Sequence, residues 1–508
     1  MDYDYKWAIT LLLKYDTKED LSNQVFTYIQ RLIAGLVSEA AQSSLCVNII
    51  LLCDASGRQL FKAHHAAALQ GTPTLYVLRY STKLADDAFW YNKLWVVFQD
   101  VEERFEVLQT APATEAIDSP GLTGLLKRAL RDITYQSNMV VAWDHGNSFS
   151  IFKMHPPAPP SGMLGESLSS QVEAALNNPI NNNWQLFVPK ASPVSPPPPL
   201  GVAATVRLFN AADAPMASTT DEGPIFFDLA PQKPLALTMD ELGDALRQLE
   251  KKVNVLVLAN CFMCSADTLY GLRDAVEILV AAETAIPFNI FDYAQVMKAR
   301  GTGQATAAEV AQRLVAQVKM STEHWYHEGV DKGLISERIA VFALDMSHSN
   351  TDYWNELDQL CQALTQQIRQ HPGAAKALVS HMDALTNLPG LIASADISLH
   401  LLDARRFFER AAYLFRTPAI YAAYTSFSAT HTWMRRIADD YFIGARAADT
   451  AYACSGLSLF FPRSRTQFNC AYIRYYYNGA QQNPYRSAFA KKYGWDEFLH
   501  ALFLGLPV

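Results

Sequence analysis

Long hydrophobic runs are missing from this chain of 508 residues, although half of its residues are hydrophobic. No apolar stretch reaches the roughly 20 residues that a membrane-spanning helix needs, so we expect no membrane partner. Clusters of lysine and arginine are missing too, and the net charge is -8. Because nucleic acids are bound by basic surfaces, we expect no nucleic-acid partner either.

Cysteine is scarce and odd in number, which argues against a disulfide framework. The seven cysteines are Cys46, Cys53, Cys261, Cys264, Cys361, Cys454 and Cys470. Of these, Cys46, Cys53 and Cys361 lie in apolar patterns and are expected to be inert core thiols. The N-terminus lacks the basic start, the apolar core and the small-residue cleavage site of a secretory leader. Together these two absences predict a cytoplasmic protein.

Strand-like apolar runs alternate with helix-like segments along most of the chain, as in residues 7–13, 19–41 and 47–53. Such alternation predicts an α/β fold with a mostly parallel central sheet. Residues 155–224 interrupt the pattern with proline-rich and asparagine-rich stretches. We interpret this segment as an exposed insertion or linker.

Two chemically reactive side chains stand where predicted strands end. Cys261 follows the apolar run 253–259 and precedes a helix-like segment, and His145 with Gly146 follows the apolar run 139–143. Ligands of parallel sheets bind beyond the carboxyl ends of the strands. Backbone N–H groups and the positive end of a helix at that place would favour a thiolate. A thiol and an imidazole at one sheet edge are the minimum for a cysteine hydrolase.

Cys264 leaves other interpretations open, because it forms a Cys-x-x-Cys pair with Cys261. Zinc would need a second such pair or a nearby histidine cluster, so we expect no metal site. A dithiol oxidoreductase, whose cysteine pair also lies at the start of a helix, remains an alternative. The plainer alternative is that both thiols are core residues without chemistry.

Five short motifs occur in a fixed order along the chain. They are Trp143-Asp144-His145-Gly146, Cys261-Phe262-Met263, Ala281-Ala282-Glu283 with Pro287, residues 455–462, and the closing residues 485–499. In this order they resemble the clostripain-like cysteine peptidases (peptidase family C11), which are related to caspases. The resemblance covers nearly the whole chain apart from the insertion and parts of the region 350–440. It implies a caspase-like α/β/α sandwich with a mostly parallel central sheet and a C-terminal extension.

The resemblance also implies a division of the chain into four parts. Residues 1–154 would form the first half of the catalytic core, with the histidine motif, and residues 225–348 the second half, with the cysteine motif. Residues 155–224 would be the Pro-rich insertion between them. Residues 349–508 would form a C-terminal helical extension with a late strand and a closing helix.

Peptide hydrolysis through a thioacyl-enzyme is the chemistry that the resemblance implies. Cys261 would be the nucleophile and His145 the general acid, and the backbone N–H groups of Gly146 and Cys261 would form the oxyanion hole. Relatives of this kind are often latent precursors cut in the middle, so we expect a zymogen and a protein partner that activates or inhibits it. The substrates would be proteins or peptides. We expect no cofactor, and calcium is the one that the resemblance leaves open.

Two carboxylates are absent from the substrate pocket that the resemblance implies. The family places acids two residues before the cysteine and in the loop after the next strand, where this chain has Ala259 and Asn289. Those acids hold an arginine or lysine of the substrate, and burying such a cation without a partner is costly. We therefore expect a neutral residue before the scissile bond, unless Asp292 restores a carboxylate. The same losses favour the alternative of an inactive scaffold or regulatory protein that keeps the peptidase fold.

Overall fold

The computed structural model describes a defined set of residues, and every structural statement below concerns them. They are residues 5–15, 32, 35–36, 45–53, 74–80, 105–112, 119–144, 150–151, 237–284, 286, 290–298, 305–329, 338–346, 351–385, 401–431, 436–443, 455–461 and 487–504.

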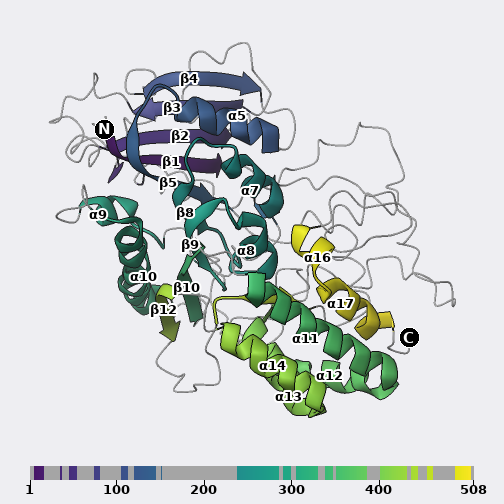
Figure 1. The fold of residues 1–508 in the computed structure, drawn as a ribbon. Coiled ribbons are helices and arrows are strands. Elements are labelled where there is room, and N and C mark those ends of the chain that lie inside the picture. The colour runs from purple at the N-terminus through teal and green to yellow at the C-terminus, as the bar shows by residue number, and fades with distance from the viewer. Residues whose placement is uncertain are drawn as a thin grey trace, which may run out of the picture.

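A sheet of nine described strands forms the centre of the structure (Figure 1). From edge to edge the order is β12 (Arg436–Ile443), β10 (Arg338–Asp345), β9 (Val276–Ala282), β8 (Val253–Ala259), β5 (Tyr135–Trp143), β1 (Tyr5–Tyr15), β2 (Leu45–Cys53), β3 (Thr74–Tyr80) and β4 (Phe105–Pro112). Neighbouring strands are parallel except in the pairs that involve β3 or β10. All the other strands therefore run in one direction, and the prediction of a mostly parallel sheet is confirmed.

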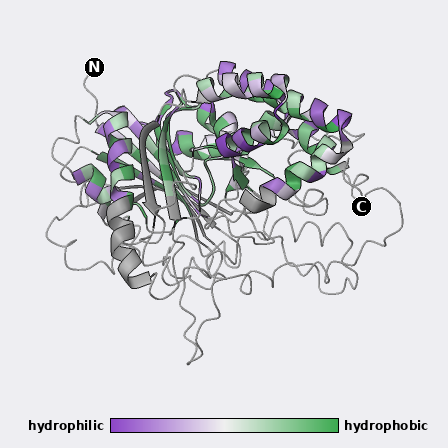
Figure 2. Cartoon of the chain, turned by 90° about the horizontal axis from the view of Figure 1, so that it is seen from below, coloured by the Kyte–Doolittle hydropathy of each residue, from purple (hydrophilic) through white to green (hydrophobic). Residues whose placement is uncertain are grey.

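Helices cover both faces of this sheet. α5 (Ser119–Ala129), α7 (Met239–Arg247) and α8 (Ala266–Leu272) lie against one face, and α9 (Tyr293–Lys298) and α10 (Ala307–Gly329) lie against the other. Alternate side chains of β8 enter the two apolar clusters: Leu256 and Leu258 join the first, and Val255 and Val257 join the second. Figure 2 shows the resulting hydrophobic strands between the helix layers. Burial on both faces explains why this strand is a continuous apolar run in the sequence.

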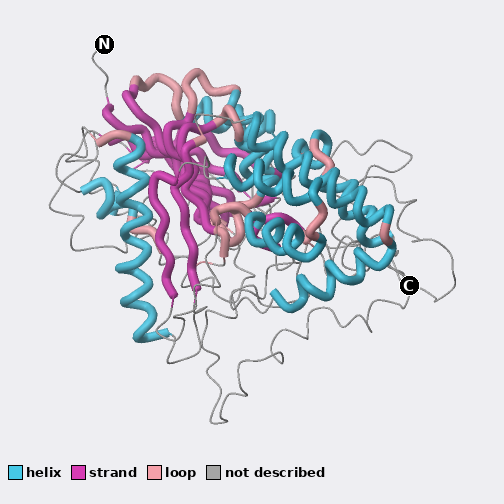
Figure 3. The backbone as a smooth tube through the Cα atoms, turned by 60° about the horizontal axis from the view of Figure 1, so that its bottom comes forward, coloured by secondary structure: helices cyan, strands magenta, loops and turns pink. Residues whose placement is uncertain are grey.

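A C-terminal layer of helices packs over α8 and extends the first apolar cluster. Figure 3 shows helices stacked outward from the sheet on the side where the C-terminus lies. The layer contains α11 (Thr351–Gln370), α12 (Pro372–Leu385), α13 (Ala404–Phe415), α14 (Pro418–His431), α16 (Ala488–Lys492) and α17 (Trp495–Leu504), with β11 (Leu401–Asp403) paired to β13 (Ser458–Phe460). The ring of Tyr270 on α8 meets Trp354 at 5.3 Å and Tyr493 at 5.2 Å between centroids, both edge to face. The C-terminal layer and the main sheet therefore share one core.

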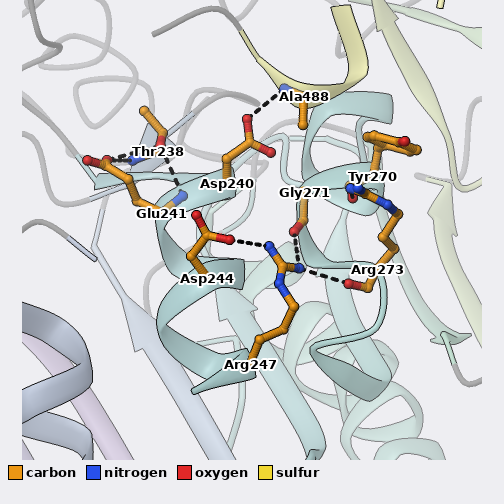
Figure 4. Close-up of polar contacts among 9 residues, drawn as sticks. All are labelled: Thr238, Asp240, Glu241, Asp244, Arg247, Tyr270, Gly271, Arg273 and Ala488. Carbon is orange, nitrogen blue, oxygen red and sulfur yellow. Dashed lines mark hydrogen bonds and ion pairs between the residues drawn. The ribbon is translucent and has the colours of Figure 1, made fainter. Parts of the chain in front are cut away.

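The close approach of α7 and α8 depends on two glycines. A Cβ on Gly243 would lie 2.1 Å from the carbonyl oxygen of Gly271, so a larger residue cannot fit there. Beside this contact, the Arg247 guanidinium donates to the carbonyl oxygens of Gly271 at 3.1 Å and Arg273 at 2.9 Å (Figure 4). These bonds satisfy carbonyl groups that the end of α8 leaves without helical partners.

A short two-stranded sheet holds the two ends of the segment 152–236. β6 (Ser150–Ile151) pairs antiparallel with β7 (Leu237–Thr238). Ile151 and Leu237, which lie far apart in the sequence, are therefore adjacent in the structure. The predicted insertion at 155–224 lies outside the described residues and stays a prediction.

The remaining sequence predictions have mixed outcomes. Cys46 and Cys361 are buried as expected, and burial raises the pKa of the Cys361 thiol well above its usual value. Most of the predicted helix-like segment 19–41 lies outside the described residues. Among the helices that are described, none combines the length and the apolar composition needed to cross a membrane.

Candidate active site

The ends of β5 and β8 lie side by side at one edge of the sheet. Trp143 pairs with Ala259 in parallel register, so the next residues, Asp144 and Asn260, leave the sheet together. The Asn260 side-chain amide donates to the Asp144 carbonyl oxygen at 2.7 Å, and both residues are buried. His145 is bonded to Asp144 and lies, with Gly146, outside the described residues. The sequence analysis assigned no role to Asn260, because a side chain that bonds a backbone carbonyl has no sequence signature.

Cys261 lies at the rim of the sheet. Its side chain is partly exposed and packs against both apolar clusters, one on each face. The Ile286 backbone N–H donates to the Cys261 sulfur at 3.4 Å, and the Cys261 thiol donates to the Ile286 carbonyl oxygen at 3.6 Å. An N–H aimed at sulfur favours the thiolate form of a cysteine. The bond that the thiol donates to the Ile286 carbonyl favours the neutral form instead, so the two backbone contacts act in opposite directions.

The source of that N–H group differs from the sequence prediction. We expected the start of the following helix to supply it, but α8 begins at Ala266, and the Ser265 hydroxyl caps the helix by accepting from the Thr268 N–H at 3.2 Å. The donor to the sulfur is Ile286, in the loop after β9. Every residue except proline carries such a donor, so sequence reasoning had no signal with which to find it.

The turn after Cys261 has a left-handed backbone at Phe262, with φ of 62°. Such a conformation costs a residue with a Cβ about 1–3 kcal/mol and persists where the surroundings impose it. Two backbone bonds do so here: Phe262 N–H donates to Thr284 O at 3.1 Å, and Cys264 N–H donates to Ala282 O at 2.9 Å. The Phe262 ring is also buried. The end of β9 therefore sets the path of the turn that carries Cys261.

Cys264 is a poor candidate for redox chemistry. Its side chain is fully buried, and burial, reinforced by the negative charge of Glu283, raises the pKa of its thiol well above the usual value. Thiol–disulfide exchange requires a thiolate with access to its partner. The structure thus argues against the dithiol alternative and gives Cys264 a packing role.

The three residues named for the substrate pocket have different positions. Ala259 is the last residue of β8 and belongs to the same apolar cluster as Ile286 and Ile290. Asn289 lies outside the described residues. Asp292 is exposed, and its carboxylate accepts from the Gln295 N–H at 2.9 Å at the start of α9. Asp292 is therefore engaged as a helix cap, which weakens its case as a replacement for the missing pocket acids.

No group of three or more His, Cys, Asp or Glu side chains within the described ranges is arranged to hold a metal ion.

Comparison with known protein families matches residues 225–501 to the sequence model of the clostripain family, Peptidase_C11. The match covers more than half of the chain, including Cys261 and the late motif. This chain belongs to the clostripain family. Members of the clostripain family are cysteine peptidases, so the protein is a cysteine-type hydrolase that acts on peptides. No curated protein matches the chain.

Solved structures of cysteine proteases resemble this chain at low identity. A secreted C11 cysteine protease from Bacteroides thetaiotaomicron is 11% identical, with a TM-score of 0.45 over 98% of this chain and 99% of that one. An inactive zymogen C11 protease from Parabacteroides distasonis is 12% identical, with a TM-score of 0.43 over 91% and 93%. A cysteine protease from B. fragilis is 16% identical, with a TM-score of 0.31 over 51% and 95%.

The prediction of a cytoplasmic location is wrong. The similar protease from Bacteroides thetaiotaomicron is described as secreted, and we withdraw the prediction. It depended on scarce cysteine and on the composition of the first residues. Neither property determines in which compartment a folded peptidase acts, because a large apolar core can stabilise a protein without disulfides.

Proposed function

We propose that this clostripain-family protein is an endopeptidase in which Cys261 is the nucleophile and His145 the general acid. The observation that carries the proposal is the bond from Asn260 to the Asp144 carbonyl, since it joins the residue before the cysteine to the residue before the histidine. The pairing of β5 with β8 supports the same juxtaposition. It also supports the proposal that residues 1–154 and 225–348 are two halves of one core, with 155–224 inserted between them and 349–508 as an extension.

In the proposed reaction, the Cys261 thiolate attacks the carbonyl carbon of the scissile peptide bond, and a C–S bond forms. The C–N bond then breaks, and His145 gives its proton to the leaving amine. Water attacks the thioacyl-enzyme, which releases the acid product and restores the thiol. The N–H groups of Gly146 and Cys261 would stabilise the oxyanion, a contribution of about 10²–10³ in rate for each such donor.

We also propose that the enzyme is latent until the chain is cut within residues 155–224. The pairing of Ile151 with Leu237 supports this, because both ends of the segment stay fixed beside each other and a cut between them leaves the sheet intact. Incubation of the purified protein should give two fragments that remain associated, while Cys261→Ala stays as one chain. Intact mass spectrometry checks this outcome. A single uncut species in both samples would rule out self-processing.

An electrophilic peptide probe tests the central proposal. A peptide with a neutral residue before an acyloxymethyl ketone should add one probe mass to the native protein, and peptide mapping should place the adduct on Cys261. Heat-denatured protein is the control, because a reaction that depends on the folded site disappears on unfolding. A folded protein that hydrolyses no member of a peptide library and forms no adduct at Cys261 would instead support the scaffold alternative.

A further inference from the structure

Residues 455–461, which we call the late strap, lie directly against the turn that carries Cys261. Within the strap, Ser458 is buried and donates to the Cys264 carbonyl oxygen twice, through its backbone N–H at 2.8 Å and through its hydroxyl at 3.0 Å. Ser458 also forms an isolated parallel bridge with Ser265. The strap therefore holds the end of the Cys261 turn, just before α8 begins.

Glu283 connects the strap to the other support of the turn. It lies between Ala282 and Thr284, the two residues whose carbonyl groups hold Cys264 and Phe262. The Glu283 carboxylate is buried, with 4% of the residue exposed, and accepts from the Gly456 N–H at 2.8 Å. Burying a carboxylate costs free energy unless strong hydrogen-bond donors replace the water that it loses. The hydrogen bond from Gly456 therefore connects the strap to residues 282–284, which hold the Cys261 turn.

Gly456 is suited to this contact by its conformation. Its φ is +90°, and a Cβ at this position would lie 3.2 Å from the Phe342 ring. Residues with a side chain rarely adopt such a backbone. The N–H of residue 456 can therefore reach the Glu283 carboxylate in the narrow space between β10 and the strap.

The opposite side of the strap is anchored in the C-terminal layer. Leu457 O accepts from the Ala404 N–H at 2.9 Å, and the Asp403 carboxylate accepts from the Ser455 N–H at 2.5 Å. The Trp495 indole donates to Phe460 O at 3.0 Å. Bonds thus run from α13 and α17 through the strap to both sides of the Cys261 turn.

We propose that Glu283 and Ser458 are positioning residues, through which the C-terminal layer sets the orientation of the Cys261 thiol. This inference rests on the proposed function, in which Cys261 is the nucleophile. The left-handed turn at Phe262 keeps its shape because bonds on both sides impose it. Loss of the bond between Gly456 and Glu283, or of the bond between Ser458 and Cys264, lets the turn relax. A displacement of the Cys261 sulfur by about 1 Å can lower the rate about 10²-fold.

Glu283→Ala should lower kcat for peptide hydrolysis by about 10²-fold and leave KM within about threefold, because substrate contacts stay intact. The rate of Cys261 alkylation by iodoacetamide should fall by at least about tenfold at neutral pH, since the sulfur leaves the Ile286 N–H. Glu283→Gln keeps an oxygen that accepts from Gly456 and should recover most of kcat. Ser458→Ala removes one hydroxyl and should give a smaller loss of the same kind.

Asp240 provides the matched control. Its carboxylate accepts from the Ala488 N–H at 2.7 Å, a bond of the same type that also joins the core to the C-terminal layer (Figure 4). It lies beside Gly271, at the end of α8 that is far from Cys261. Asp240→Ala should lower Tm about as much as Glu283→Ala while leaving kcat and the alkylation rate unchanged.

The outcomes separate a positioning role from a structural one. A Glu283→Ala variant that loses Tm but keeps kcat and the alkylation rate would overturn the proposal, and so would an equal loss of kcat in Asp240→Ala. If Glu283→Ala does not fold, Ser458→Ala decides by the same readouts. Retained hydrolysis in Cys261→Ala would refute the proposed function itself, a result that is independent of every strap variant.

Discussion

Cys261→Ala should lower kcat/KM for peptide hydrolysis by about 10⁴-fold or more, because in the proposed mechanism the thioacyl intermediate forms on the Cys261 sulfur. His145→Ala should lower it by about 10²–10⁴-fold through loss of proton donation to the leaving amine. The double variant should be no worse than Cys261→Ala alone, since the two residues act as one unit. Initial rates on a fluorogenic peptide, taken from the single and double variants at equal folded concentration, measure all three effects.

Cys264→Ala is the matched control for this series. It removes a thiol three positions along the same turn, but that thiol is fully buried and faces the apolar cluster. The variant should keep kcat/KM within a few-fold of the wild type and lose some stability, as expected when a small core side chain is truncated. Near-normal activity in Cys261→Ala, or loss of activity in Cys264→Ala alone, would contradict the assignment of the nucleophile.

The central strands could be predicted from the sequence because burial on two faces leaves a strong local signal. β8 and β5 are runs of apolar residues, and a mostly parallel sheet brings their carboxyl ends to one edge. The nearness of Asp144 and Asn260 depends in addition on the pairing of β5 with β8, which neither strand's sequence determines. Two of the family motifs indicate the same sites, because they lie at the ends of β5 and β8 and include His145 and Cys261.

Contacts between distant parts of the chain could not be predicted in this way. The strand-like residues 456–462 predicted a late strand, but β13 pairs with β11 outside the main sheet, and the Ser458 bond to Cys264 spans 194 residues. The sequence also gives no indication that β3 and β10 run antiparallel to their neighbours, because the residues of a strand do not determine which strand it pairs with. The Ile286 donor is a backbone group, so its chemistry is the same at almost every position.

Peptides with a neutral residue before the scissile bond should be cleaved about 100-fold faster than matched peptides with arginine there. Ala259, which the resemblance places at the substrate pocket, lies in an apolar cluster with Ile286 and Ile290, and the carboxylate of Asp292 is engaged as the cap of α9. Burying an unpaired guanidinium costs about 3 kcal/mol or more, which corresponds to about 100-fold in kcat/KM. Rates on a pair of fluorogenic peptides that differ in this residue measure the ratio directly.

Ala259→Asp should reverse this preference if Ala259 occupies the place of the missing acid. The new carboxylate would form a charge-assisted pair with the substrate arginine, and hydrolysis of the arginine peptide should rise by at least about tenfold. Ala259→Asn has nearly the same volume without the charge and should leave the arginine peptide slow. Because Ala259 is buried, both variants are compared at equal folded fraction, with Tm as the check. Faster cleavage of the arginine peptide by the wild type would show that another carboxylate serves the pocket, and Asp292→Asn would then test whether that carboxylate is Asp292.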